Sequence, residues 1–169
     1  MRTGQLARLG LLTALVAAVT LAVRIPMPAT EGYLNLGDGI IIAGALLFGP
    51  IAAAAAGGVG SALADLYGGY SHWALPTLAI KGLEGYIVGF LSHRAWSERT
   101  GALRVLLALP GAILGAVTMV SGYFGVEYFF FSLPPALASL PGNAMQGLVG
   151  LLAGISLAAA LERSGLKSA

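Results

Sequence analysis

The sequence predicts an all-α polytopic membrane protein with six transmembrane helices. Its 169 residues are 57% hydrophobic and only 9% charged, with a mean hydropathy of +0.86. Soluble domains, in contrast, carry about 25% charged residues. Six apolar runs, most of them long enough for a membrane-spanning helix, lie between the charges and turn signals. The 25 glycines are about twice the usual share,, and such small residues let membrane helices approach closely.

The apolar runs define the six spans in order. The first ends at Arg24-Ile25-Pro26, which is unlike a small-residue cleavage site, so we expect a retained helix rather than a signal peptide. The second run is short, and Pro50 suits the first turn of the helix that follows it. Pro110 predicts a kink or a later start in the fifth span. The expected spans are residues 5–23, 36–48, 50–66, 75–93, 103–128 and 142–161, forming a single membrane domain over residues 1–169.

The positive charges predict the orientation. Seven of the nine lysines and arginines fall on one side of the six spans, and by the positive-inside rule this side is cytoplasmic. Both termini are then cytoplasmic, which requires an even number of spans. These seven residues are Arg2, Arg8, Arg94, Arg99, Arg104, Arg163 and Lys167.

The sequence lacks the motifs of an enzyme or a primary pump. It has no GxxxxGK[ST] phosphate loop, no GxSxG elbow and no cysteine,. His72 and His93 fall at opposite ends of the fourth span, so they cannot share a metal ion. We therefore predict no catalytic residues, no cofactor and no metal site, and expect a protein that binds or conducts a ligand.

A stripe of small residues follows one face of the first span. Gly10, Ala14, Ala18 and Ala22 recur every four residues, which gives a smooth face for a partner helix. The partner is either another helix of this bundle or a separate protein. Similar small residues on the third and fourth spans are interpreted as packing within the bundle.

Ionisable residues in the outer half of the membrane are candidates for function. Asp65 and Lys81 fall at similar depths on neighbouring spans, so we predict a structural ion pair between them. Glu84 follows Lys81 by three residues and lies on the same helix face. Asp38 is expected to cap the second span.

Polar and aromatic residues near the same side predict a ligand pocket. Amide side chains offer both donors and acceptors, and aromatic rings can stack on a flat ligand. The loop over residues 24–37 is expected to cover this pocket, and the connections near residues 68–73 and 132–141 to line its opening. The predicted substrate-binding residues are Asn35, Trp73, Lys81, Glu84, Tyr123, Tyr128, Asn143 and Gln146.

Several sequence blocks together resemble a known family. They are Gly32-Tyr33-Leu34-Asn35-Leu36-Gly37-Asp38, Phe48-Gly49-Pro50, Gly60-Ser61-Ala62-Leu63-Ala64-Asp65, and Thr77 followed by Lys81-Gly82-Leu83-Glu84-Gly85. In combination they are similar to the substrate-binding S components of energy-coupling factor (ECF) vitamin transporters. The nearest group is the riboflavin-type S-component family, which also includes carriers for thiamine precursors and pyridoxine.

The resemblance implies a six-helix bundle in the plasma membrane with both termini cytoplasmic and a substrate pocket in its outer half. It also implies partners: a scaffold membrane protein and two cytoplasmic ATPases. Ala14 and Ala18 match the small-xxx-small motif that contacts the scaffold in that family. The implied function is the capture of riboflavin, a hydroxymethylpyrimidine thiamine precursor or pyridoxine for ATP-driven uptake. The alternative is a structural membrane protein of a cell-envelope complex, which would need no ligand.

Overall fold

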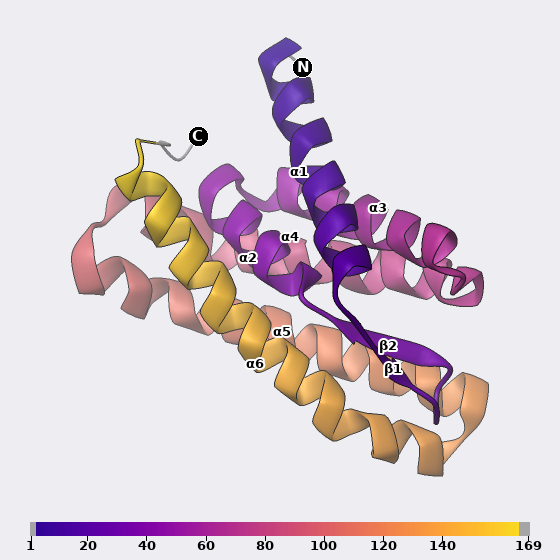
Figure 1. The fold of residues 1–169 in the computed structure, drawn as a ribbon. Helices are drawn as coiled ribbons and strands as arrows, with labels where there is room; N and C mark the ends of the chain where they lie inside the picture. The colour runs from indigo at the N-terminus through magenta and orange to yellow at the C-terminus, as the bar shows by residue number, and fades with distance from the viewer. Residues whose placement is uncertain (1–2, 166–169) are drawn as a thin grey trace.

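The computed structural model describes residues 3–165 and contains six α-helices and one β-hairpin within that range (Figure 1). The predicted all-α membrane fold is confirmed. Arg2 and Lys167, which contributed to the predicted orientation, lie outside the described residues. In chain order the elements are α1 (Thr3–Ala22), β1 (Arg24–Met27), β2 (Gly32–Asn35), α2 (Gly37–Phe48), α3 (Pro50–Gly68), the 3₁₀ turn η1 (Ser71–Trp73), α4 (Ala74–Glu98), α5 (Gly101–Phe131) and α6 (Leu133–Arg163).

Five of the described helices are long and apolar enough to cross a membrane, by length and composition, and α2 is shorter. In Figure 1, the start of α1 lies at the top, the end of α6 at the upper left and the α4–α5 connection at the left. The hairpin and the α3–α4 and α5–α6 connections lie toward the lower right. The helices thus alternate in direction as the charge pattern requires. Which side of the membrane each end faces stays a prediction.

The boundary between α5 and α6 differs from the predicted one. Helix α6 begins at Leu133 rather than near Gly142, and only Ser132, with a φ of 83°, separates it from α5. The expected outer connection over residues 132–141 is therefore wrong. Pro134 lies in the first turn of α6, where its missing N–H removes no intrahelical hydrogen bond, and Pro141 lies inside the helix without ending it.

Glycines bring the backbones of α3 and α4 into contact. A Cβ atom added at Gly85 would lie 2.6 Å from the carbonyl oxygen of Ala53, and one at Gly89 would lie 2.5 Å from backbone atoms of Pro50. Larger residues at these positions would force the helices apart. The small residues of these two spans therefore pack inside the bundle. Helix α2 lies at its centre, with ten of its twelve residues buried.

The small-residue stripe of α1 faces away from the bundle. Gly10, Ala14, Ala18 and Ala22 are all exposed, and a Cβ atom added at Gly10 would meet no atom within 4 Å. The residues that α1 buries are Leu12, Val16 and Thr20, on its other side. Internal packing therefore leaves the stripe uncovered.

The segment after α1 forms a hairpin rather than an irregular loop. Strand β1 pairs antiparallel with β2 in a register that sets Pro26 opposite Tyr33 and Met27 opposite Gly32. A proline is tolerated here because each strand of a two-stranded sheet has a free edge. At the base of the hairpin, Arg24 donates a hydrogen bond of 3.1 Å to the carbonyl oxygen of Gly68 at the end of α3. The hairpin lies over one end of the helix bundle, as the predicted cover of the pocket would (Figure 1).

Candidate functional site: a polar pocket beneath the hairpin

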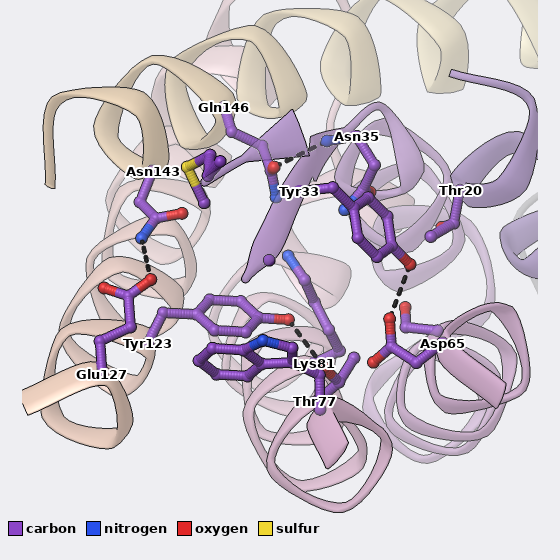
Figure 2. Close-up of a pocket in the computed structure, with 14 residues that line it drawn as sticks. Thr20, Tyr33, Asn35, Asp65, Thr77, Lys81, Tyr123, Glu127, Asn143 and Gln146 are labelled. Carbon is purple, nitrogen blue, oxygen red and sulfur yellow. Dashed lines mark hydrogen bonds between the residues drawn. The ribbon is translucent and has the colours of Figure 1, made fainter. Parts of the chain in front are cut away.

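A polar pocket lies between the hairpin and the helices (Figure 2). Its cavity volume is about 30 Å³, enough for one or two water molecules. Five of the six helices and both strands contribute side chains, so residues distant in sequence meet here. The lining residues are Thr20, Met27, Gly32, Tyr33, Asn35, Ser61, Asp65, Trp73, Thr77, Lys81, Tyr123, Glu127, Asn143 and Gln146.

The floor of the pocket is a buried charge cluster. The Lys81 ammonium contacts the Asp38 carboxylate and lies 3.1 Å from Glu84 Oε2. Gln146 Nε2 donates to the second Asp38 oxygen over 2.9 Å. Lys81 is 1% exposed, and Asp38 and Glu84 are 0% exposed. Two carboxylates in direct contact with one ammonium compensate its loss of hydration on burial.

This cluster corrects two predictions. Lys81 pairs with Asp38 and Glu84, not with Asp65. The predicted pair was based only on the similar depths of Asp65 and Lys81 in the membrane. Depth does not specify the direction in which each side chain points from its helix. Asp38 also forms no side-chain cap for α2, because its carboxylate is engaged by Lys81 and Gln146 instead.

Asp65 instead anchors the hairpin. The Tyr33 hydroxyl on β2 donates a hydrogen bond of 2.6 Å to Asp65 Oδ1. Burial, and then this hydrogen bond, raises the pKa of Tyr33, so the hydroxyl keeps its proton and remains the donor. The second oxygen, Asp65 Oδ2, is buried and has no hydrogen-bond partner among the residues described.

Two aromatic rings form one wall. The Trp73 and Tyr123 rings are 5.8 Å apart between centroids, at an interplanar angle of 62°. The Tyr123 hydroxyl donates to Thr77 Oγ1 over 3.2 Å, and the Lys81 ammonium lies 5.6 Å from the centre of the Tyr123 ring. Trp73 donates through Nε1 to the carbonyl oxygen of Thr30 over 3.3 Å. These contacts fix the rings on the edge of the pocket, where a flat ligand can pack against them.

The adjoining wall comes from α5 and α6. Asn143 Nδ2 donates to Glu127 Oε1 over 3.3 Å, and Ser139 donates to Glu127 Oε2. Gln146 Oε1 accepts a hydrogen bond of 2.8 Å from the backbone N–H of Asn35. Figure 2 shows Asn143 and Glu127 on one side of the pocket and Asp65 on the other, with Lys81 between them.

Six of the eight predicted substrate-binding residues line this pocket, namely Asn35, Trp73, Lys81, Tyr123, Asn143 and Gln146. Two do not. Tyr128 is 56% exposed and points away, because it follows Glu127 by about 100° around α5. Glu84 is buried behind Lys81 and is absent from the lining.

Sequence reasoning missed several lining residues, among them Tyr33, Thr77 and Glu127. Tyr33 stands two residues before Asn35, so both project from one face of a strand, but the strand itself was not predicted. Glu127 follows Tyr123 by four residues and therefore shares its helix face. This spacing of four residues could have predicted that Glu127 lines the pocket together with Tyr123.

Metal coordination has no candidate within residues 3–165, where no group of three His, Asp or Glu side chains is arranged to hold an ion. The chemistry of the pocket is that of hydrogen bonding, stacking and charge.

Comparison with known proteins identifies the family. A family model described as ECF-type riboflavin transporter, S component, matches residues 1–163. An uncharacterised protein from Pyrococcus woesei is 45% identical over 148 residues, which cover 88% of this chain and 95% of that protein. The thiamine precursor transporter HmpT from Lactococcus lactis subsp. cremoris (strain MG1363) is 32% identical over 163 residues, which cover 96% of this chain and 90% of that protein. The chain therefore belongs to the family of ECF-type riboflavin transporter S components, and is a multi-pass plasma-membrane transport protein rather than an enzyme.

Proposed function

We propose that this chain captures a small, single-ring, nitrogen-containing heterocycle of the thiamine-precursor type and delivers it to an ATP-driven import module. The observation that carries the proposal is the buried pocket, which combines side-chain amides and carboxylates with an aromatic wall. Such a set suits a flat ligand that carries several hydrogen-bonding groups. The named relative, a thiamine precursor transporter, supports the same ligand class.

The size of the pocket favours one ring over three. A cavity of about 30 Å³ is smaller than any of these ligands, so the walls must move apart on binding. A pyrimidine or pyridine ring needs far less displacement than the fused rings and sugar chain of riboflavin. Because the hairpin is attached through only a few side-chain hydrogen bonds, including Tyr33 to Asp65 and Asn35 to Gln146, it is the wall that can move at least cost.

The ligand proposal is tested with the purified chain. In calorimetric titration of the detergent-solubilised protein, we expect 4-amino-5-hydroxymethyl-2-methylpyrimidine to bind, and riboflavin to bind more weakly. In liposomes the chain alone should not concentrate the ligand, since it has no nucleotide-binding motif,. Co-reconstitution with scaffold and ATPase subunits should give ATP-dependent uptake. Absence of binding by every heterocycle would favour the alternative of a structural membrane protein, and ATP-independent accumulation would contradict the coupling.

We also propose that the exposed stripe of α1 docks on the scaffold protein. Ala14 and Ala18 lie on the outward face, where a second helix can approach the backbone closely. Beside this face, an apolar groove of about 490 Å³ runs between α1, α2 and α6, with Leu11, Leu15 and Leu157 among its lining residues.

The double substitution Ala14→Trp/Ala18→Trp should reduce co-purification with the scaffold and ATPases by about tenfold or more, because the indoles hold two helices apart. Ligand affinity of the isolated chain should stay within about twofold, since neither residue lines the pocket. Leu83→Trp/Phe90→Trp provides a matched control on the exposed face of α4 and should co-purify normally. If the Ala14→Trp/Ala18→Trp variant co-purifies with the scaffold and ATPases as well as the wild type does, the stripe contacts lipid rather than the scaffold.

A further inference from the structure

Two carboxylates at this site have a buried oxygen without a partner among the described residues, Asp65 and Glu84, and of these two only Asp65 lines the pocket. Glu127 accepts hydrogen bonds from Ser139 and Asn143, one on each oxygen. Both Asp38 oxygens are engaged, by Lys81 and Gln146. Asp65 accepts at Oδ1 from Tyr33, whereas its Oδ2 is buried without a partner among the described residues.

The free oxygen faces a place where a ligand can reach it. Asp65 is 3% exposed and lines the pocket. In Figure 2 one of its oxygens meets the Tyr33 hydroxyl, and the other is turned toward the side of the pocket where Thr77 lies. Leaving a carboxylate oxygen buried and unpaired costs free energy, so a donor supplied by the ligand would satisfy a group that the chain itself leaves unsatisfied.

The surroundings of this oxygen select the kind of donor. The Thr77 hydroxyl, which accepts from Tyr123, also interacts with the Asp65 carboxylate, so Thr77 joins the aromatic wall to Asp65. A ring packed against the Trp73–Tyr123 wall therefore presents its edge to Asp65. An ionised carboxylate can only accept hydrogen bonds, so the ring edge must carry a donor; on an aminopyrimidine ring that donor is the N–H of the amino group.

Resting on the proposed function, we infer that Asp65 is the specificity-determining residue of the pocket. Its Oδ2 atom accepts an N–H from an exocyclic amino group, and the pocket thereby prefers an amino-substituted heterocycle to one with an acceptor at the same position. A site that hydrogen-bonds one substituent of a ligand discriminates strongly against an analogue of the ligand that lacks this substituent. With the analogue bound, the buried protein group is left without a hydrogen-bond partner.

Two probes and two variants test this inference. The probes are 4-amino-5-hydroxymethyl-2-methylpyrimidine and its 4-methoxy analogue, which replaces the N–H donor by an acceptor. Calorimetric titration of the solubilised full chain should show the amino compound binding about 10- to 100-fold more tightly, as expected for a hydrogen bond to a charged group. In Asp65→Asn, Oδ1 can still accept from Tyr33 while an amide N–H replaces the free oxygen. This variant should lose most of the preference or reverse it.

Tyr33→Phe is the matched control. It removes the hydrogen bond to Asp65 but keeps the free carboxylate oxygen, so it should weaken both probes by a similar factor and preserve the preference. A merely structural role for Asp65 would give the same pattern in both variants. A wild-type preference below threefold, or a preference retained in Asp65→Asn, would overturn the inference while leaving the proposed function intact. Failure of both probes to bind the wild-type chain would overturn both. The wild-type comparison needs no variant, so a folding defect in Asp65→Asn does not remove the test.

Discussion

Replacement of Lys81 by methionine is expected to lower the free energy of unfolding by about 3–5 kcal/mol. Lys81 Nζ contacts both Asp38 and Glu84, and all three side chains are at most 1% exposed. Methionine fills a similar volume but leaves two buried carboxylates without a cation. The measurement is thermal unfolding of the wild type and the variant side by side, in detergent and without ligand.

The triple variant Asp38→Asn/Lys81→Met/Glu84→Gln is the control for this experiment. It removes the whole ion cluster, so no charge remains uncompensated, and it should recover most of the lost stability. Recovery would locate the effect in charge balance rather than in the packing of the lysine stem. Wild-type stability in Lys81→Met alone would show that water or proton uptake compensates the carboxylates.

The phosphate monoester of any bound heterocycle should bind at least about 100-fold more weakly than the free alcohol. The pocket and its floor carry four carboxylates, Asp38, Asp65, Glu84 and Glu127, against one buried cation, Lys81. Bringing like charges together in a buried site costs several kcal/mol, and each 1.4 kcal/mol is a factor of ten in affinity. The cation near the hairpin base, Arg24, is exposed and donates to the Gly68 carbonyl.

Competition titrations separate charge from size in this prediction. The methyl ether of the same hydroxymethyl group adds bulk without charge and should lose much less affinity than the phosphate ester. Comparable losses for the two compounds would mean that the pocket excludes the ester by volume. An ester that binds within tenfold of the alcohol would contradict the electrostatic argument altogether.

The order and type of the helices could be predicted from the sequence because they depend on apolar runs and isolated charges. Hydropathy is a property of consecutive residues, so α1, α3, α4 and α5 appear close to their predicted bounds. The start of α6 could not be placed, since Pro134 and Pro141 are equally typical of a loop and of a helix in a membrane. The hairpin over residues 24–35 was hidden for a similar reason: Pro26 and Pro28 mask the alternation of a strand.

The members of the pocket could be predicted better than their partners. Asn143, Gln146 and Lys81 stand out as polar residues in apolar helices, whatever they touch. Their partners depend on the rotation of each helix about its axis, which depth does not specify. This is why Lys81 was assigned to Asp65, although it lies against Asp38 at the start of α2. A short helix gives no periodic signal long enough to fix its rotation.

The shortness of α2 has a consequence for how this protein makes room for a ligand. A helix of 12 residues rises roughly 18 Å, some 12 Å less than the hydrocarbon core. A lipid-facing helix of this length would expose polar backbone to acyl chains, but α2 is surrounded by protein, so the deficit carries no such penalty. The start of α2 lies beneath the polar pocket, where Asp38 contacts Lys81 and Gln146 of the lining, and the hairpin covers the pocket. One central helix that is about two turns shorter than the hydrocarbon core thus leaves room for the pocket inside the bundle. The longer helices around it need not be shortened.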